Sequence, residues 1–139
     1  MLFLLLTATT PQIVETIDFP ALDAAIERCE RAAVLPVFAA EASRRSAAVT
    51  AFYQEQLHIA SERIAAANQR RTLREAGASA AGQGESAASD RELSLRQLAL
   101  DDRQRALDDQ RRLETMRQEG VDLKRTYFLS KCAGNKKAD

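Results

Sequence analysis

The stretch Gly77-Ala-Ser-Ala-Ala-Gly-Gln-Gly-Glu-Ser-Ala-Ala-Ser89 is the only segment of the chain that is rich in Gly and Ser. Such a composition is typical of a flexible linker. Sequence rich in good helix formers flanks it on both sides. A helical arm before the linker can therefore fold back on a helical arm after it. The sequence predicts an all-α protein that forms a long antiparallel, coiled-coil-like helical hairpin, and the main rival is an elongated parallel dimer of the second arm.

The bulk composition also favours helices that share a narrow seam. The chain has 139 residues, which is the usual length of a single domain. Aromatic residues make up 5% of it, with no Trp, and charged residues make up 29%. Much of the apolar 45% is Ala, which buries little area, so a thick core is not expected. The alternation of apolar and polar residues that marks strands is missing. The formal net charge is zero, which argues against a nucleic-acid partner.

The two cysteines lie at nearly matching positions on either side of the linker. Cys29 is 54 residues before Gln83, and Cys132 is 49 residues after it. The difference of five residues is about 7 Å of helix, which linker slack or a kink can absorb. In an exported protein two such cysteines predict one disulfide. The alternative is two free thiols. Because no Cys-x-x-Cys spacing occurs, a thioredoxin-type redox site has no support.

Residues 1–10 resemble a secretory signal. The apolar run Met1-Leu-Phe-Leu-Leu-Leu6 precedes small and polar residues, as in a cleavable signal, but it lacks a basic start and is shorter than about 15 residues. We interpret it as a cleaved signal peptide, either whole or truncated. It falls short of the roughly 20 residues that cross a bilayer, so no membrane span is expected. The alternatives are a short apolar segment packed on the helices and an anchor at a lipid surface.

The first helical arm is predicted at 21–76, after an irregular lead-in at 11–20. Pro36 removes a backbone hydrogen bond, so this arm is expected to kink or break there, with a possible short extra helix before it. Beyond Pro36, small and apolar residues recur at steps of three and four. We expect this stripe to face the other arm. It consists of Ala39, Ala42, Ser46, Val49, Tyr53, Gln56, Ala60, Ile64 and Ala67.

The second helical arm is predicted at 90–132, with Ser89 or Asp90 as its N-cap. Leu93, Leu100 and Leu107 are spaced by seven and define the start of a seam. The seam is expected to continue through Leu113, Met116, Val121, Leu123, Tyr127 and Phe128. The pairs Asp101–Arg105 and Asp108–Arg112 are expected to stabilise the helix as i,i+4 ion pairs. Residues 133–139 are predicted to be a disordered basic tail.

Residues that could carry chemistry are few. His58 is the only histidine and lies far along the arm from both cysteines, whereas zinc sites usually need several His or Cys ligands. The pairs Asp101-Asp102 and Asp108-Asp109 could hold a divalent cation, but arginines follow each within four residues, which favours a solvated, salt-bridged face. No nucleophile elbow or phosphate loop occurs. We expect no enzymatic activity, cofactor, metal or small-molecule substrate.

These observations lead to two functional hypotheses. The first is an exported, periplasmic, non-enzymatic hairpin closed by a Cys29–Cys132 disulfide, which acts through protein–protein contacts as a scaffold, envelope accessory or holdase. The second is a cytoplasmic coiled-coil adaptor, or a secretion or export accessory, with reduced cysteines. Both require a protein partner or self-association.

Overall fold

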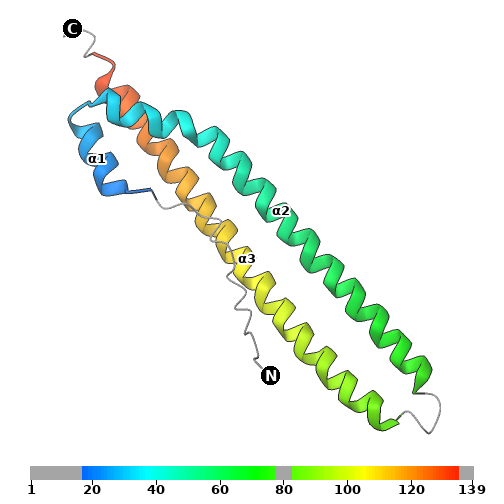
Figure 1. Cartoon of the computed structure of the whole chain (residues 1–139). Helices are drawn as coiled ribbons and strands as arrows, with labels where there is room; N and C mark the ends of the chain where they lie inside the picture. The colour runs from blue at the N-terminus through cyan, green and yellow to red at the C-terminus, as the bar shows by residue number, and fades with distance from the viewer. Residues whose placement is uncertain (1–16, 78–82, 135–139) are drawn as a thin grey trace, which may run out of the picture.

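The computed structural model describes residues 17–77 and 83–134, and within these ranges it contains three helices and no strand. They are α1 (Phe19–Glu27), α2 (Arg31–Ala76) and α3 (Gln83–Cys132). The two long helices run antiparallel to each other, and α1 lies beside the C-terminal part of α3 (Figure 1). The predicted all-α antiparallel hairpin is therefore confirmed, and α1 is the short extra helix expected before Pro36.

Helix α1 has clear start and stop signals. The side chain of Asp18 accepts a hydrogen bond from the backbone N–H of Ala21 at 3.0 Å, and a proline occupies the first turn. At the other end, the N–H of Glu30 donates to the carbonyl of Ala25 at 2.9 Å, and the N–H of Cys29 donates to the carbonyl of Ile26 at 3.0 Å. This pair of bonds is the Schellman motif that ends many helices.

The break between α1 and α2 lies at residues 28–30 and not at Pro36. Cys29 has a φ of 53°, which is the left-handed conformation that stops a helix. Pro36 lies inside α2, close to its first turn. An N–H at this position would have bonded to the carbonyl of Ala32, so α2 gives up a single backbone hydrogen bond there and continues. Residue 29 therefore separates the two helices.

The second arm begins earlier than predicted. Helix α2 ends at Ala76 as expected, but α3 begins at Gln83, so the described residues 83–89 of the predicted linker are helical. Asp90 lies inside α3, where its carbonyl accepts a hydrogen bond from the Ser94 hydroxyl at 2.9 Å, and the expected N-cap at Ser89 or Asp90 is wrong. Alanine strongly favours a helix and serine disfavours it only slightly, so the alanines and serines of this segment allow α3 to begin before residue 90. Residues 1–16, 78–82 and 135–139, with the signal-like segment and most of the tail, lie outside the described residues.

The seam between the long helices follows a heptad period. Along α3 every seventh residue is buried: Leu93, Leu100, Leu107, Glu114, Val121 and Phe128. Opposite them α2 buries Val34, Glu41, Ala48, Phe52, Ile59 and Ala66. The leucine spacing predicted for the second arm thus marks the true seam. Each helix supplies roughly one apolar residue per heptad, and polar side chains fill the remaining seam positions.

Most of the stripe that was predicted to face the second arm lies on the outside of the molecule. Gln56 is the exception that reaches the second arm, because its side-chain amide exchanges hydrogen bonds with that of Gln104 at 3.0 and 3.1 Å. Val49, Tyr53 and Ile64 are exposed, whereas Phe52 and Ile59, beside the predicted stripe, are buried. On α3, Leu113, Met116, Leu123 and Tyr127 are likewise exposed, and of the predicted continuation Val121 and Phe128 alone are buried. Neighbouring positions on a helix differ by about 100° in direction, so a shift of one residue changes the face. The seam face of α2 carries charged residues, which a search for an apolar stripe passes over.

Candidate functional site

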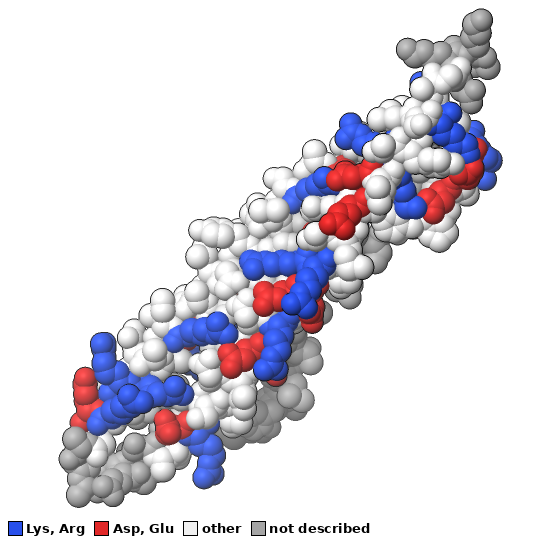
Figure 2. All heavy atoms as spheres, turned by 180° about the vertical axis from the view of Figure 1, so that it is seen from behind, with Lys and Arg blue, Asp and Glu red and all other residues white. Residues whose placement is uncertain are grey.

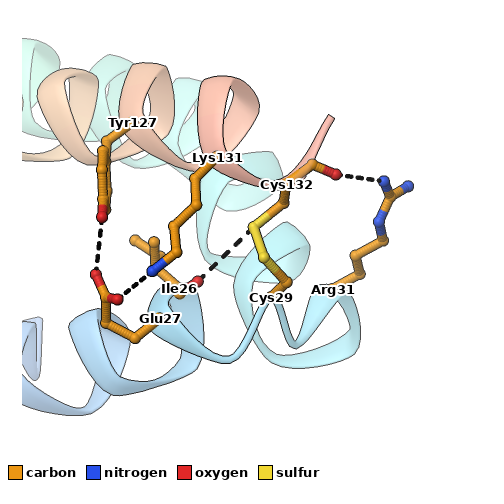
Figure 3. The surroundings of a disulfide bond; sticks show 7 residues. All are labelled: Ile26, Glu27, Cys29, Arg31, Tyr127, Lys131 and Cys132. Carbon is orange, nitrogen blue, oxygen red and sulfur yellow. Dashed lines mark hydrogen bonds and ion pairs between the residues drawn. A yellow bond between two sulfur atoms is a disulfide. The ribbon is translucent and has the colours of Figure 1, made fainter. Parts of the chain in front are cut away.

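The end of the hairpin opposite its connection is closed by a disulfide. Cys29 and Cys132 are bonded, with Cα atoms 5.7 Å apart and a sequence separation of 103 residues (Figure 3). The bond joins the corner between α1 and α2 to the last residue of α3. The side chain of Cys132 is buried, and its sulfur lies 3.7 Å from the carbonyl oxygen of Ile26. The structure therefore brings the predicted cysteine pair together.

Polar contacts fix α1 and the helix ends around this disulfide. Arg31 donates a hydrogen bond to the carbonyl of Cys132 at 3.2 Å and so satisfies one of the last carbonyls of α3 (Figure 3). The carboxylate of Glu27 accepts hydrogen bonds from the ammonium of Lys131 and, at 3.0 Å, from the hydroxyl of Tyr127. The bond from Lys131, followed by that from Tyr127, lowers the pKa of Glu27. Helix α1 is thus held against α3 by charge as well as by the disulfide.

An apolar cluster and a second ion pair complete this end. Leu22 and Ile26 of α1 pack with Val34 of α2 and with Phe128 of α3. On the surface, Lys124 forms an ion pair with Asp23, and its ammonium also lies 5.3 Å from the centre of the Phe19 ring. The disulfide end is therefore a small three-helix core rather than an open cleft.

A buried group of four charged residues lies further along the seam. Arg117 donates two hydrogen bonds to the carboxylate of Glu41, at 2.8 and 3.0 Å. Arg44 bonds to Glu41 at 3.0 Å and to both carboxylate oxygens of Glu114. Beside these four residues, Arg45 also donates to Glu41 at 2.9 Å and pairs with Asp122 at 2.8 Å, so that three arginines and three carboxylates neutralise each other across the helices. The arrangement fixes the register of α2 against α3, because a slip of one heptad would leave these charges buried without partners.

A third polar cluster surrounds His58. Arg103 of α3 donates to Glu55 at 2.7 Å and to Glu62 at 2.9 Å, both on α2. The same guanidinium lies 2.8 Å from Nδ1 of His58, whose Nε2 is 3.2 Å from Glu62. The hydrogen bond from Arg103 lowers the pKa of Glu62. His58 is mostly exposed at the edge of the seam, and its neighbours are the ion-paired residues that join the helices.

The aspartate pairs of α3 do not bond as predicted. Asp101 reaches across to Arg63 of α2 at 2.9 Å instead of pairing with Arg105. Arg105 pairs with Asp102 at 2.9 Å, three residues earlier. Arg112 similarly lies 3.7 Å from Asp109 instead of pairing with Asp108. Within residues 17–77 and 83–134 no three His, Cys, Asp or Glu side chains come together as a metal site would require.

In the middle of α2 the charged residues face the seam, and the residues that face solvent carry no carboxylate, ammonium or guanidinium group. From residue 32 to residue 68, no exposed residue is Asp, Glu, Lys or Arg. The charged residues in this range are all buried or half-buried and ion-paired across or along the seam: Glu41, Arg44, Arg45, Glu55, Glu62 and Arg63. Figure 2 shows the charges as a band along the molecule, with a largely uncharged flank beside it.

We call this uncharged side the outer face of α2. It comprises Ala39, Ala42, Ser46, Val49, Tyr53, Leu57, Ala60, Ile64 and Ala67. Its four largest side chains are well exposed to solvent: 63% for Val49, 61% for Tyr53, 51% for Leu57 and 63% for Ile64. Helix α3 differs, because charged residues such as Arg96, Asp102, Arg105 and Asp109 lie exposed along its length. The two arms therefore present different surfaces.

Neither α1, α2 nor α3 meets, over the residues described, the length and apolarity needed to cross a bilayer.

The seam charges are the feature that sequence reasoning missed. Glu114 continues the seven-residue period of Leu93, Leu100 and Leu107, so extending that period without regard to residue type would have found it. Comparison with protein-family models, with curated proteins and with solved structures gives no match for this chain.

Proposed function

We propose that the protein is a non-enzymatic, exported helical hairpin that acts by binding protein molecules, as a scaffold, envelope accessory or holdase. The observation that carries this proposal is the outer face of α2. A continuous row of exposed apolar side chains is a common mark of a protein-binding surface. Here the acidic and basic residues between 32 and 68 are all used in the seam, so none of them interrupts the row.

The organisation of the seam supports a structural role for the charged residues. Glu41 is bonded by arginines from both helices, and Arg103 is shared between two glutamates. These carboxylates are occupied in holding the helices together. A hairpin held in this way, with a disulfide at one end, presents its outer surfaces in a fixed arrangement, and a pre-ordered surface binds with a smaller loss of conformational entropy.

The exported location rests on the cysteine pair. Disulfides persist in oxidising compartments and are rare in the cytoplasm. We expect the periplasm, and the alternative is a cytoplasmic adaptor or export accessory in which both thiols are reduced.

The compartment is tested by thiol status. The protein is purified from its native host without reductant, alkylated at once and digested for mass spectrometry. A linked peptide containing Cys29 and Cys132 is the expected result. Two alkylated cysteines would contradict export into an oxidising compartment and would favour the cytoplasmic adaptor.

Protein binding is tested by photo-crosslinking in the native host. A photoreactive phenylalanine analogue replaces Tyr53 on the outer face of α2, and the control carries the same analogue at Leu98, an exposed position among the charges of α3. We expect covalent protein adducts of defined mass from position 53 and none from position 98. Identical patterns from the two positions, or no adduct from position 53, would contradict binding through the outer face.

A further inference from the structure

The two halves of the disulfide differ in their access to solvent. Cys132 is 2% exposed and belongs to the apolar cluster at this end of the hairpin, whereas Cys29 is half-buried and packs at the edge of that cluster. The sulfur of Cys132 also lies against the carbonyl oxygen of Ile26, at 3.7 Å (Figure 3). A reagent in solution can therefore approach the disulfide from the side of Cys29 and is kept away from Cys132.

The chain around Cys29 leaves this approach open. Cys29 is the middle residue of the corner 28–30, where the chain turns from α1 into α2 at one end of the molecule (Figure 1). Its neighbours Arg28 and Glu30 are both exposed and form an ion pair with each other at 2.6 Å. Because these opposite charges largely cancel beside Cys29, an incoming thiolate meets little repulsion at the corner.

We propose that Cys29 is the sulfur at which a dithiol exchanges with this disulfide. Cys132 is then the sulfur that leaves when the bond is reduced and that closes the bond when it forms. In thiol–disulfide exchange a thiolate attacks one sulfur of a disulfide and expels the other, so access decides which sulfur is attacked. The inference goes beyond the proposed function, because it holds in an oxidising and in a reducing compartment alike.

Reduction takes two exchanges. In the first, a thiolate of the dithiol bonds to the sulfur of Cys29, the bond to Cys132 breaks, and the electron pair stays on Cys132, which takes up a proton from water. In the second, the other thiolate of the reagent attacks the reagent's own sulfur in the mixed disulfide and releases Cys29, which is protonated in turn. The reagent leaves as a disulfide, oxidised by two electrons, and this chain keeps two thiols. Formation of the bond follows the same steps in reverse.

The packing around the bond explains why the reagent needs two thiols. After the first exchange Cys132 stays beside Cys29, because α1 keeps its apolar contacts with Phe128 and its ion pair with Lys131, and Arg31 keeps its hydrogen bond to the carbonyl of Cys132. A thiol that is held in place reacts as if it were highly concentrated. Cys132 therefore expels a reagent with one thiol and re-forms the bond, whereas the second thiol of a dithiol competes with this return.

The difference in reactivity is tested on two matched variants of the full chain. Cys132→Ser leaves Cys29 as the single thiol, and Cys29→Ser leaves Cys132. Both are treated with dithiodipyridine, an uncharged aromatic disulfide whose release of thiopyridone gives the rate, and circular dichroism checks that both keep their helices. In the folded chain we expect Cys29 to react at least about 10-fold faster than Cys132. In concentrated urea, where access no longer differs, we expect rates within about threefold of each other. Equal rates in the folded chain, or a faster reaction of Cys132, would overturn the proposal.

A second measurement uses the original chain with its disulfide intact and so does not depend on how the variants fold. The chain is incubated briefly with glutathione, quenched with acid and digested with pepsin for mass spectrometry. We expect glutathione on the peptide that contains Cys29 and a free thiol on the peptide that contains Cys132. Glutathione on Cys132, or equally on both cysteines, would overturn the proposal.

A protein probe distinguishes the two possible sources of the dithiol, a small molecule and a protein. Thioredoxin whose second active-site cysteine is replaced by serine keeps one reactive thiol and cannot release itself from a mixed disulfide. A covalent complex with the original chain, linked through Cys29, would support the proposal and identify a protein dithiol as able to reach the corner. Glutathione at Cys29 without such a complex would also support it and would restrict the exchange to small thiols. A complex linked through Cys132 would overturn it.

Discussion

Arg117 of α3 binds Glu41 of α2 through two parallel hydrogen bonds, at 2.8 and 3.0 Å, in the interior of a molecule that has few large apolar residues to bury. The two side chains are 6% and 9% exposed. A buried ion pair adds little stability compared with two apolar residues, but removal of one partner leaves an uncompensated charge. The pair therefore defines which residues of the two helices face each other.

The first prediction concerns this pair. Glu41→Gln removes a buried carboxylate that Arg117, Arg44 and Arg45 share. Arg44 keeps Glu114 and Arg45 keeps Asp122, so the compensating charge is reduced rather than lost, and we expect the free energy of unfolding to fall by up to roughly 3 kcal/mol. Urea denaturation followed by circular dichroism measures the change. The control is Asp109→Asn, an exposed residue of α3, for which a change within about 0.5 kcal/mol is expected. Equal effects of the two substitutions would show that Glu41 has no special role.

A second prediction follows from the left-handed backbone at Cys29. Glycine adopts this conformation without the steric penalty of roughly 1 kcal/mol that a side chain incurs. In a chain that already carries Cys132→Ser, Cys29→Gly should therefore be more stable than Cys29→Ser by about 1 kcal/mol. Both variants lack the disulfide, so their difference in stability reports the cost of the left-handed backbone conformation at residue 29. Thermal denaturation of the two proteins side by side provides the measurement, and a more stable serine variant would contradict the explanation.

The third prediction concerns acid stability. The hydrogen bond from Arg103 holds the pKa of Glu62 below its ordinary value of 4.5. Because the folded-state pKa is the lower one, the stabilisation by this carboxylate is complete above pH 4.5 and is lost as the pH falls through the folded-state pKa. We expect the melting temperature to drop below pH 4.5, and less steeply in Glu62→Gln. An unchanged slope in Glu62→Gln would contradict this role of the Arg103–Glu62 contact.

The fourth prediction concerns Gly120, which lies inside α3. A Cβ atom at this position would be 3.5 Å from Cζ of Phe19, an ordinary van der Waals contact. Alanine favours a helix over glycine by about 1 kcal/mol. Gly120→Ala should therefore stabilise the protein by up to about 1 kcal/mol in urea denaturation. A loss of stability would mean that Phe19 needs the space that the glycine leaves.

The sequence allowed the hairpin, its cysteine pair and the leucine positions of α3 to be predicted, because each rests on spacing. Leu93, Leu100 and Leu107 show their period whatever surrounds them. The buried face of α2 could not be found in the same way. Its seam positions include Glu41 and Glu55, whereas the neighbouring stripe is small and apolar, so a search that places charges outside chooses the wrong face.

The C-terminal end of α1 could not be predicted from the sequence for a different reason. A helix that ends in a left-handed residue usually has glycine at that position. Here the position is taken by Cys29, whereas Pro36, the residue with the stronger sequence signal, lies where the helix tolerates it. Local sequence rules therefore pointed to the wrong residue as the breaking point.

The disulfide also decides how mechanical load travels through this molecule. Cys29 and Cys132 enclose both long helices within one covalent ring. Tension applied between Ile17 and Gly134 would pass through α1 and the sulfur–sulfur bond and would bypass the hairpin. A protease cut between Gly77 and Gln83 would likewise leave two fragments that stay joined until a reductant is added. The arms are thus protected against being pulled or cut apart, even where the linker between them is broken.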